Sequence, residues 1–263
     1  MPIVAAPQMA VRDCDPAYNL STVVERVRDL PETVDVALFP EYALTGFVAN
    51  EAIRDAALAV DGDELDRVRA LAAETDVAVL VGHVERRGDD LHNAVTYCPP
   101  DGAATTYRKR HLWGDEKSVL TPGTERVVVD TPAGPTGLLT CFDLNFVAES
   151  VAHAAEEVRA LFVPGAWPAA HSENWRLLLR ARALDGVRWV VGAGRTGRGT
   201  AGDEPTVYAG RSTVVRPDGA VAAALNRGER DLVVDLDPAV VDEQREFIPA
   251  LRDSALSTEA TKR

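Results

Sequence analysis

Short apolar runs alternate along the chain with segments whose apolar residues recur at helical spacing, and this alternation constrains the fold most strongly. Strand-like runs occupy residues 2–7, 34–39, 77–84, 91–97, 103–107, 127–129, 137–141, 160–163, 187–191, 212–215, 221–225 and 232–236. Helical spacing covers residues 20–30, 65–72, 147–158, 174–184 and 238–245. Hairpin turns such as Pro217-Asp218-Gly219 join several of the strands, so the sheets must be mixed rather than purely parallel.

About a dozen strands exceed the roughly 4–6 strands of an ordinary open sheet. Two sheets packed face to face, with the helices on their outer faces, would bury all of them. No linker-like segment interrupts the alternation, and we therefore expect one α/β domain over residues 1–263. The last ten or so residues, about 254–263, should form a flexible tail.

Composition and charge exclude several classes of partner and location. The net charge of −13 argues against nucleic acid or an anionic membrane as a partner. No apolar run approaches the ~20 residues of a membrane span, and the first residues, MPIVAAPQ, lack the features of a signal peptide. Three widely spaced cysteines do not suit a disulfide framework, so the expected location is the reducing cytoplasm.

Three polar side chains stand at the ends of predicted strands. Glu41 follows the run that ends in Phe39, Lys109 follows the run that ends in Tyr107, and Cys141 ends its own run. In α/β sheets, ligands bind beyond the carboxyl ends of strands. There a cysteine suits a nucleophile, a glutamate its general base, and a lysine the cation that holds an oxyanion. Together the three form a set that can carry out acyl transfer.

Each of the three side chains has a plainer interpretation when it is taken alone. Cys141 also suits a small buried apolar residue, Glu41 a solvated loop carboxylate and Lys109 part of a surface basic run. The composition draws attention to the lysine, because only Lys109, Lys117 and Lys262 among the 28 basic residues are lysines. A compact ammonium group is not interchangeable with a guanidinium group.

Other signals carry less weight. Residues 192–197 match the GxGxxG pattern of dinucleotide sites, but the following RGTAGDEPT predicts a loop where such a site needs a helix. We therefore expect a flexible segment that lines the mouth of a pocket. The five histidines have no metal-ligand spacing, which predicts no metal site. Trp167 follows the run that ends in Val163, where it either lines the pocket or packs in the core.

The segments around these residues, taken in order, resemble the carbon–nitrogen hydrolase (nitrilase) superfamily. The matches are FPEYALTGF around Glu41, YRKRHLW around Lys109, LLTCFDLNF around Cys141, then WRLLLRARA, YAGRSTVVRPDG and REFIPALRD. Glu116, ahead of LTPG, resembles the second glutamate of the family. Each segment alone is weak evidence for the family, but the ordered set of segments covers nearly the whole chain and is specific to it. The resemblance implies an α-β-β-α sandwich and a homodimer or higher homo-oligomer.

The resemblance also implies that the protein hydrolyses a small-molecule amide, linear and non-peptide, without a metal or organic cofactor. Glu41 would take the proton from Cys141, whose thiolate would attack the amide carbonyl and leave a thioester for water to hydrolyse. Lys109 and the backbone N–H of Phe142 would hold the oxyanion. Glu116 would orient Lys109 or the substrate.

Departures from the family pattern bear on the substrate. Asn145 stands where many relatives carry an arginine that in some binds a substrate carboxylate, which disfavours acidic substrates such as an N-carbamoyl amino acid. Phe142 and Asp143 resemble the amidase pattern more than that of true nitrilases. An N-carbamoyl amidohydrolase, a nitrilase and a non-catalytic ligand-binding member stay open as alternatives. A further alternative is a cysteine hydrolase that pairs its thiol with His153 or His171.

Overall fold

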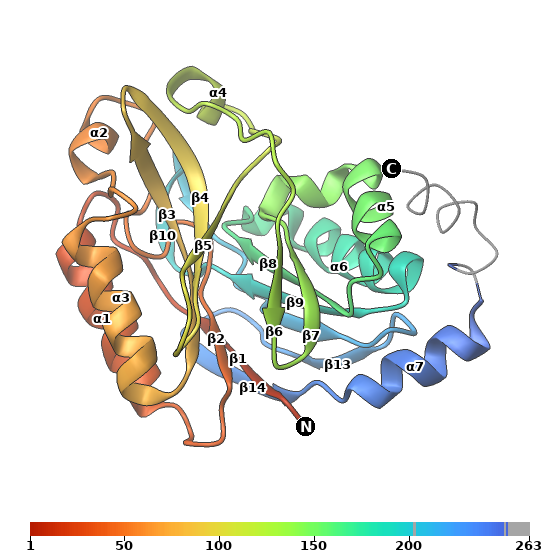
Figure 1. Cartoon of the computed structure of the whole chain (residues 1–263). Helices are drawn as coiled ribbons and strands as arrows, with labels where there is room; N and C mark the ends of the chain where they lie inside the picture. Colours follow the sequence, from red (N-terminus) through yellow and green to blue (C-terminus); the bar gives the residue numbers. More distant parts are fainter. Residues whose placement is uncertain (202–203, 250, 252–263) are drawn as a thin grey trace.

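The computed structural model describes residues 1–201, 204–249 and 251. Two six-stranded mixed sheets pack face to face, and helices cover their outer faces (Figure 1). This architecture confirms the predicted α-β-β-α sandwich.

The first sheet contains β1 (Ile3–Gln8), β2 (Val36–Leu38), β3 (Ala78–Arg87), β4 (Asp90–Cys98), β5 (Thr105–Arg108) and β14 (Arg230–Asp235). Their order across the sheet is β14-β1-β2-β3-β4-β5. β1, β2 and β3 run parallel, and each pairing beyond β3 is antiparallel. β5 therefore runs in the same direction as β2, and their carboxyl ends lie at the same edge of the sheet.

The second sheet contains β6 (Val128–Thr131), β7 (Gly134–Leu138), β8 (Ala160–Gly165), β9 (Trp189–Gly194), β12 (Thr213–Val215) and β13 (Val221–Ala224). Their order is β13-β12-β9-β8-β7-β6, with β7, β8 and β9 parallel at the centre. The outer strands pair antiparallel on both sides. Each sheet thus has three parallel strands that end at a common edge.

Two helices cover each sheet. α1 (Pro16–Asp29) and α3 (Asp63–Thr75) lie outside the first sheet, and α5 (Val147–Ala155) and α6 (Ser172–Gly186) lie outside the second (Figure 1). α7 (Pro238–Phe247) follows the edge strand β14, and α2 (Ala52–Ala56) and α4 (Glu116–Val119) are short. Two 3-10 turns, Cys141–Asn145 and Ala169–His171, follow β7 and β8.

Alternate side chains of the strands build separate cores. On β1, Val4 and Ala6 belong to the core between the sheets, whereas Ala5 packs with residues of α1 and α3. On β8, Phe162 belongs to the same inter-sheet core and Leu161 packs with residues of α6. The parallel strands are therefore buried on both faces, which explains their continuous apolar sequences.

Two segments differ from the sequence prediction. The stretch predicted as a loop after Gly197 contains a hairpin of β10 (Arg198–Ala201) and β11 (Glu204–Val207), whose short strands give too little periodicity to recognise. The glycines at 192 and 194 lie in buried strand β9 rather than in a flexible segment. A Cβ atom at Gly194 would come within 1.9 Å of the Gly210 oxygen, so close backbone packing is the reason for this glycine.

A third difference concerns residues 132–135, which we predicted as a separator between strands. They form the hairpin turn between β6 and β7, and β7 begins at Gly134. Two prolines hid the start of this strand, which we predicted only from residue 137, because proline is confined to edges and strand starts within sheets. The predicted tail at about 254–263 lies outside the described residues.

Candidate active site

Four strand ends converge at one edge of the sandwich and carry the polar groups of the site. Glu41 follows β2, Lys109 follows β5, Cys141 follows β7 and Ala166 follows β8. The first two strands share one sheet and one direction, and so do the other two. The polar side chains predicted as a set are thereby brought into contact between the two sheets.

A tight turn against β3 places Glu41. The next residue, Tyr42, has a left-handed backbone with a φ of 59°. Gly82 on β3 makes room for the turn, since a Cβ atom there would come within 2.6 Å of the Pro40 oxygen and the Tyr42 nitrogen. Glu41 is only 2% exposed, and its Oε2 accepts a hydrogen bond from the Ala166 N–H at 2.8 Å. The turn therefore places a buried carboxylate of the first sheet in contact with the backbone that follows a strand of the second sheet.

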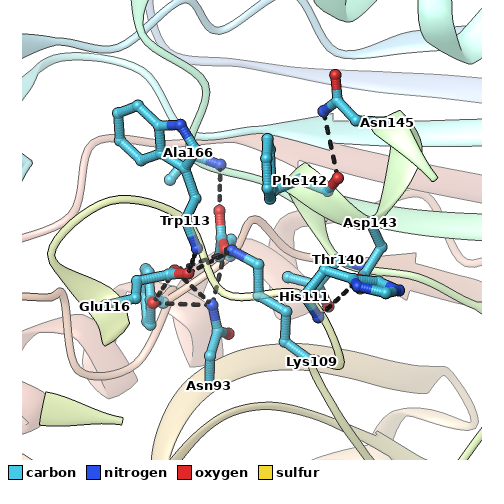
Figure 2. A network of polar contacts seen from close by, with 12 residues as sticks. Asn93, Lys109, His111, Trp113, Glu116, Thr140, Phe142, Asp143, Asn145 and Ala166 are labelled. Carbon is cyan, nitrogen blue, oxygen red and sulfur yellow. Dashed lines mark hydrogen bonds and ion pairs between the residues drawn. The ribbon is translucent and has the colours of Figure 1, made fainter. Parts of the chain in front are cut away.

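Lys109 lies between two carboxylates. Its Nζ is 2.9 Å from Oε1 of Glu41. The same nitrogen lies 2.8 and 2.9 Å from the two oxygens of Glu116 (Figure 2). Burial alone would lower the pKa of Lys109, but the charges of Glu116 and Glu41 outweigh it and raise that pKa well above its ordinary value. Lys109 is therefore a buried ammonium ion held in position by two anions.

Asn93 and Tyr42 complete this network, although the sequence did not single them out. Nδ2 of Asn93, on β4, lies 2.8 Å from Oε1 of Glu41. It also lies 3.0 Å from Oε1 of Glu116 (Figure 2). The Tyr42 hydroxyl donates to the same oxygen of Glu116. The Asn93 carbonyl also accepts the backbone N–H of Lys109 at 2.8 Å. The one signal for Asn93 was a polar residue inside an apolar strand.

Cys141 begins the 3-10 turn that follows β7. Its φ of 48° is a left-handed conformation that costs a residue with a side chain about 1–3 kcal/mol. The Glu41 side chain and the Ala166 N–H both act on the pKa of its thiol, which places the thiol beside the carboxylate. Burial, reinforced by the charge of Glu41, raises the pKa of Cys141 well above that of a free thiol, although Lys109 acts the other way. Cys141 is therefore a protonated thiol beside a carboxylate.

Asp143 ties this 3-10 turn to the segment that carries the lysine. Its Oδ2 accepts the Tyr107 hydroxyl at 2.7 Å and the Thr140 N–H at 2.9 Å. Its Oδ1 accepts the His111 N–H at 3.0 Å (Figure 2). Tyr107 and His111 flank Lys109 on either side. Burial raises the pKa of Asp143 to about 6, even though the charge of Lys109 and these hydrogen bonds lower it.

A cavity of about 320 Å³ opens beside these groups, a size that suits a small ligand. Much of its wall is aromatic, with Phe47, Trp113, Phe142, Trp167 and Tyr208 among the lining residues. Trp167 fits both interpretations offered by the sequence, because it lines the cavity and also packs on Trp175, with ring centroids 5.6 Å apart. Asn145 lines the cavity as well, and its Nδ2 donates to the Phe142 carbonyl at 3.2 Å (Figure 2).

The two candidate histidine partners of the thiol lie in different places. His171 lines the cavity, whereas His153 is buried against Gly137. No hydrogen bond joins Cys141 to either ring within the residues that the structure describes. In the same part of the chain, no group of three or more His, Cys, Asp or Glu could hold a metal ion. No described helix is long and apolar enough to cross a membrane.

Comparisons with known proteins agree with this site and fold. The carbon–nitrogen hydrolase family model matches residues 3–246. An (R)-stereoselective amidase of Pseudomonas sp is 32% identical over 95% of this chain and 90% of its own length. A probable nitrilase of Schizosaccharomyces pombe is 29% identical over 90% of this chain and 89% of its own.

A solved structure extends the likeness to three dimensions. It is a CN-hydrolase superfamily protein of Xanthomonas campestris with a TM-score of 0.87 and 27% sequence identity. The match covers 96% of this chain and 97% of that one. The chain therefore belongs to the carbon–nitrogen hydrolase family and is an amidohydrolase that acts on carbon–nitrogen bonds other than peptide bonds.

Proposed function

We propose that the protein hydrolyses small linear amides through a thioester on Cys141, with Glu41 as the proton carrier and Lys109 as an oxyanion donor. The observation that supports this most is that the Glu41 carboxylate lies beside both Cys141 and Lys109. Glu41 and Cys141 line the same cavity, and the charge of Glu41 raises the pKa of the thiol, while Oε1 of Glu41 lies 2.9 Å from the ammonium nitrogen of Lys109. A nucleophile, a base and a cation thus meet at one point of the cavity.

In the first half-reaction, Glu41 takes the proton of the Cys141 thiol as sulfur attacks the amide carbon. The carbonyl electron pair moves to oxygen, and Lys109 Nζ and the Phe142 N–H hold the oxyanion. The Phe142 N–H stands at the start of a 3-10 turn, where N–H groups have no acceptor within the turn. Glu41 then gives its proton to the amide nitrogen, the C–N bond breaks, and ammonia or an amine leaves.

In the second half-reaction, water hydrolyses the thioester. Glu41 takes a proton from water as its oxygen attacks the acyl carbon, and the same oxyanion donors act again. The C–S bond then breaks, the carboxylic acid leaves, and the proton returns from Glu41 to sulfur. Glu116 holds Lys109 through both of its oxygens, so its role is to orient the ammonium group.

The dimensions and walls of the cavity support a small substrate. A volume of about 320 Å³ bounded by aromatic side chains suits a short acyl chain. Relatives are named as an amidase and as a probable nitrilase, so both amides and nitriles are reasonable substrates for this site. The amide is our first choice, because Phe142 and Asp143 after the cysteine follow the amidase pattern. A nitrile, an N-carbamoyl compound or ligand binding alone are the alternatives.

A substrate panel scored by ammonia release tests the proposal. We expect turnover of short aliphatic amides, and hydroxylamine added to the reaction should divert part of the product to the hydroxamate. Butanamide and N-methylbutanamide should give the same ratio of hydroxamate to acid, because both pass through one thioester. A ratio that changes with the leaving amine would contradict the common intermediate. Nitrile turnover without amide turnover would favour the nitrilase alternative.

Assembly and location belong to the same proposal. Apolar side chains are exposed on α5 and α6, at Val147, Val151, Leu177 and Leu184, which supports a homodimer through this face. Light scattering behind a sizing column tests this, and a monomer at micromolar concentration would contradict it. All three cysteines are free thiols, which supports a cytoplasmic location that cell fractionation can test.

A further inference from the structure

The cavity beside Cys141 has an excess of negative charge. Three carboxylates line it, those of Glu41, Asp115 and Glu116, against the single ammonium group of Lys109. Lys109 is already paired with both buried glutamates, at 2.9 and 2.8 Å. Its charge is therefore balanced before a substrate arrives, and the wall as a whole carries two more negative charges than positive ones.

No arginine lines the cavity within the described residues. Guanidinium groups on neighbouring segments already have partners: Arg110 pairs with Glu149, and Arg195 pairs with Asp13 at 2.8 Å and lies over the Tyr208 ring, 4.2 Å from its centroid. A carboxylate on the acyl chain of a substrate would therefore enter without a counter-ion. Loss of hydration without a partner makes the binding of an isolated charge unfavourable.

Two features of the cavity suit an ammonium group instead. Asp115 is exposed, and its carboxylate has no hydrogen-bond or ion-pair partner among the residues that the structure describes. Trp113, 45% exposed, lies two residues before it on the same loop and adds an aromatic surface. A carboxylate attracts an ammonium group by charge, and aromatic faces attract it through their quadrupoles.

We propose that this cavity sorts amides by the charge of the acyl group: it favours an ammonium group, accepts a neutral chain and rejects a carboxylate. Asp115 is the residue that recognises the ammonium group. This inference rests on the proposed amide hydrolysis at Cys141 and adds a substrate class to it. The charge of the whole protein, −13, acts in the same direction at long range, so the test must separate the local effect from the global one.

Three amides of matched length separate these effects. Butanamide, 3-aminopropanamide and succinamate share a two-methylene spacer and end in a methyl, an ammonium and a carboxylate group at pH 7. We expect kcat/KM to be highest for 3-aminopropanamide and at least about tenfold lower for succinamate than for butanamide, as expected for like charges a few ångströms apart. The spread should shrink as salt rises, because added ions screen these interactions.

A pair of charge-matched variants locates the effect. Asp115→Asn should lower the ratio of kcat/KM for 3-aminopropanamide to kcat/KM for butanamide by about two- to fivefold. This is the size of effect expected from the interaction energy of an exposed ion pair. Asp101→Asn removes the same charge from an exposed turn that does not line the cavity, and it should leave the ratio unchanged. Asn145→Arg adds a cation to the wall and should raise kcat/KM for succinamate relative to butanamide.

The outcomes distinguish this inference from the proposed function. Equal kcat/KM for all three amides, or an equal shift in Asp115→Asn and Asp101→Asn, would overturn charge selection while leaving amide hydrolysis in place. A preference for succinamate would overturn it in the opposite direction. The absence of ammonia from all three amides would overturn the proposed function and this inference together.

Discussion

Oε1 of Glu41 lies 2.9 Å from Nζ of Lys109. In the proposed mechanism, this contact would couple proton transfer to oxyanion stabilisation. Glu41 would become neutral when it accepts the thiol proton, and Lys109 would lose one of its two counter-ions at the moment when the carbonyl oxygen becomes negative. The ammonium group would then be attracted toward the oxyanion. A buried site in which water is scarce strengthens each of these interactions.

Lys109→Arg should abolish most of the activity although it keeps the charge. Lys109 is 1% exposed and its ammonium group sits between Glu41 and Glu116, and a larger, planar guanidinium group would not reproduce these contacts. We expect kcat to fall by about 10²–10³-fold, the usual cost of a lost oxyanion donor. Ammonia release measures it, and full activity would contradict the assignment. Lys117→Arg, on an exposed residue of α4, is the matched control and should turn over normally.

Cys141 should be protonated in the resting enzyme. Burial and the charge of Glu41 raise the pKa of this thiol well above its ordinary value, so the thiolate is not populated at neutral pH. The ultraviolet difference spectrum between the wild type and Cys141→Ala should show no thiolate band between pH 6 and about 9. A band at pH 7 would instead indicate a standing ion pair, as in enzymes that pair cysteine with histidine.

Asp143→Asn should lower kcat more than it raises KM. The asparagine side chain has one oxygen that can accept a hydrogen bond, where aspartate has two. Its NH₂ group would therefore face either the His111 N–H or the Tyr107 hydroxyl, both of which donate to Asp143 in the wild type. The segment that carries Lys109 would shift relative to the cysteine turn. A shift of this kind reduces transition-state stabilisation, and we expect a loss in kcat of about tenfold or more.

Tyr107→Phe provides the companion variant to Asp143→Asn. It removes one donor to the Asp143 carboxylate and leaves the His111 N–H in place. Its loss in kcat should be smaller, and the double variant should lose less than the sum of the two in free energy, because both act on one carboxylate. Strict additivity would show that the two residues act independently and would contradict the positioning role.

His153 should affect acid stability and not catalysis. Burial, reinforced by Arg188, lowers its pKa from 6.5 to about 4 in the folded protein. The unfolded chain therefore binds more protons between these values, so this histidine reduces stability as pH falls from about 6.5 to about 4. Relative to wild type, His153→Leu should gain stability on the order of 3 kcal/mol between pH 7 and pH 4. Urea unfolding of both proteins at pH 7 and pH 4 measures the gain. If the difference in unfolding free energy between variant and wild type were the same at both pH values, the prediction would be contradicted.

The same histidine and His171 discriminate the catalytic alternatives. The proposed mechanism requires no histidine, so His153→Leu and His171→Ala should both keep kcat within about threefold of the wild type. A cysteine–histidine enzyme would lose most of its activity in one of them, as removal of a general base costs about 10²–10⁴-fold. Ammonia release at saturating amide decides between the two.

The sequence predicted the two-sheet fold well because most strands are continuous apolar runs. β2, β3 and β8 are buried on both faces, and such segments are recognisable without knowledge of their neighbours. The sequence failed where strands were short or interrupted. β7 begins at Gly134 beside two prolines, which obscured its start. β10 and β11 have four residues each, which is too short to show a measurable hydrophobic period.

The sequence also predicted which residues meet, but not what holds them there. Glu41, Lys109, Glu116 and Cys141 are recognisable by their place at strand ends and by the family resemblance. Asn93 was missed because its role comes from the register of β4 beside the Glu41 turn, which no local pattern encodes. Contacts between residues far apart in the chain depend on how the sheets pack, and this is why the supporting network appears only in three dimensions.

A covalent acyl group on Cys141 tests the central claim most directly. Enzyme mixed with butanamide and quenched rapidly in acid should contain a peptide with Cys141 whose mass is raised by one butanoyl group. Cys141→Ala should neither acquire this mass nor release ammonia. An acyl group on another residue, or ammonia release by Cys141→Ala at the wild-type rate, would contradict the thioester mechanism.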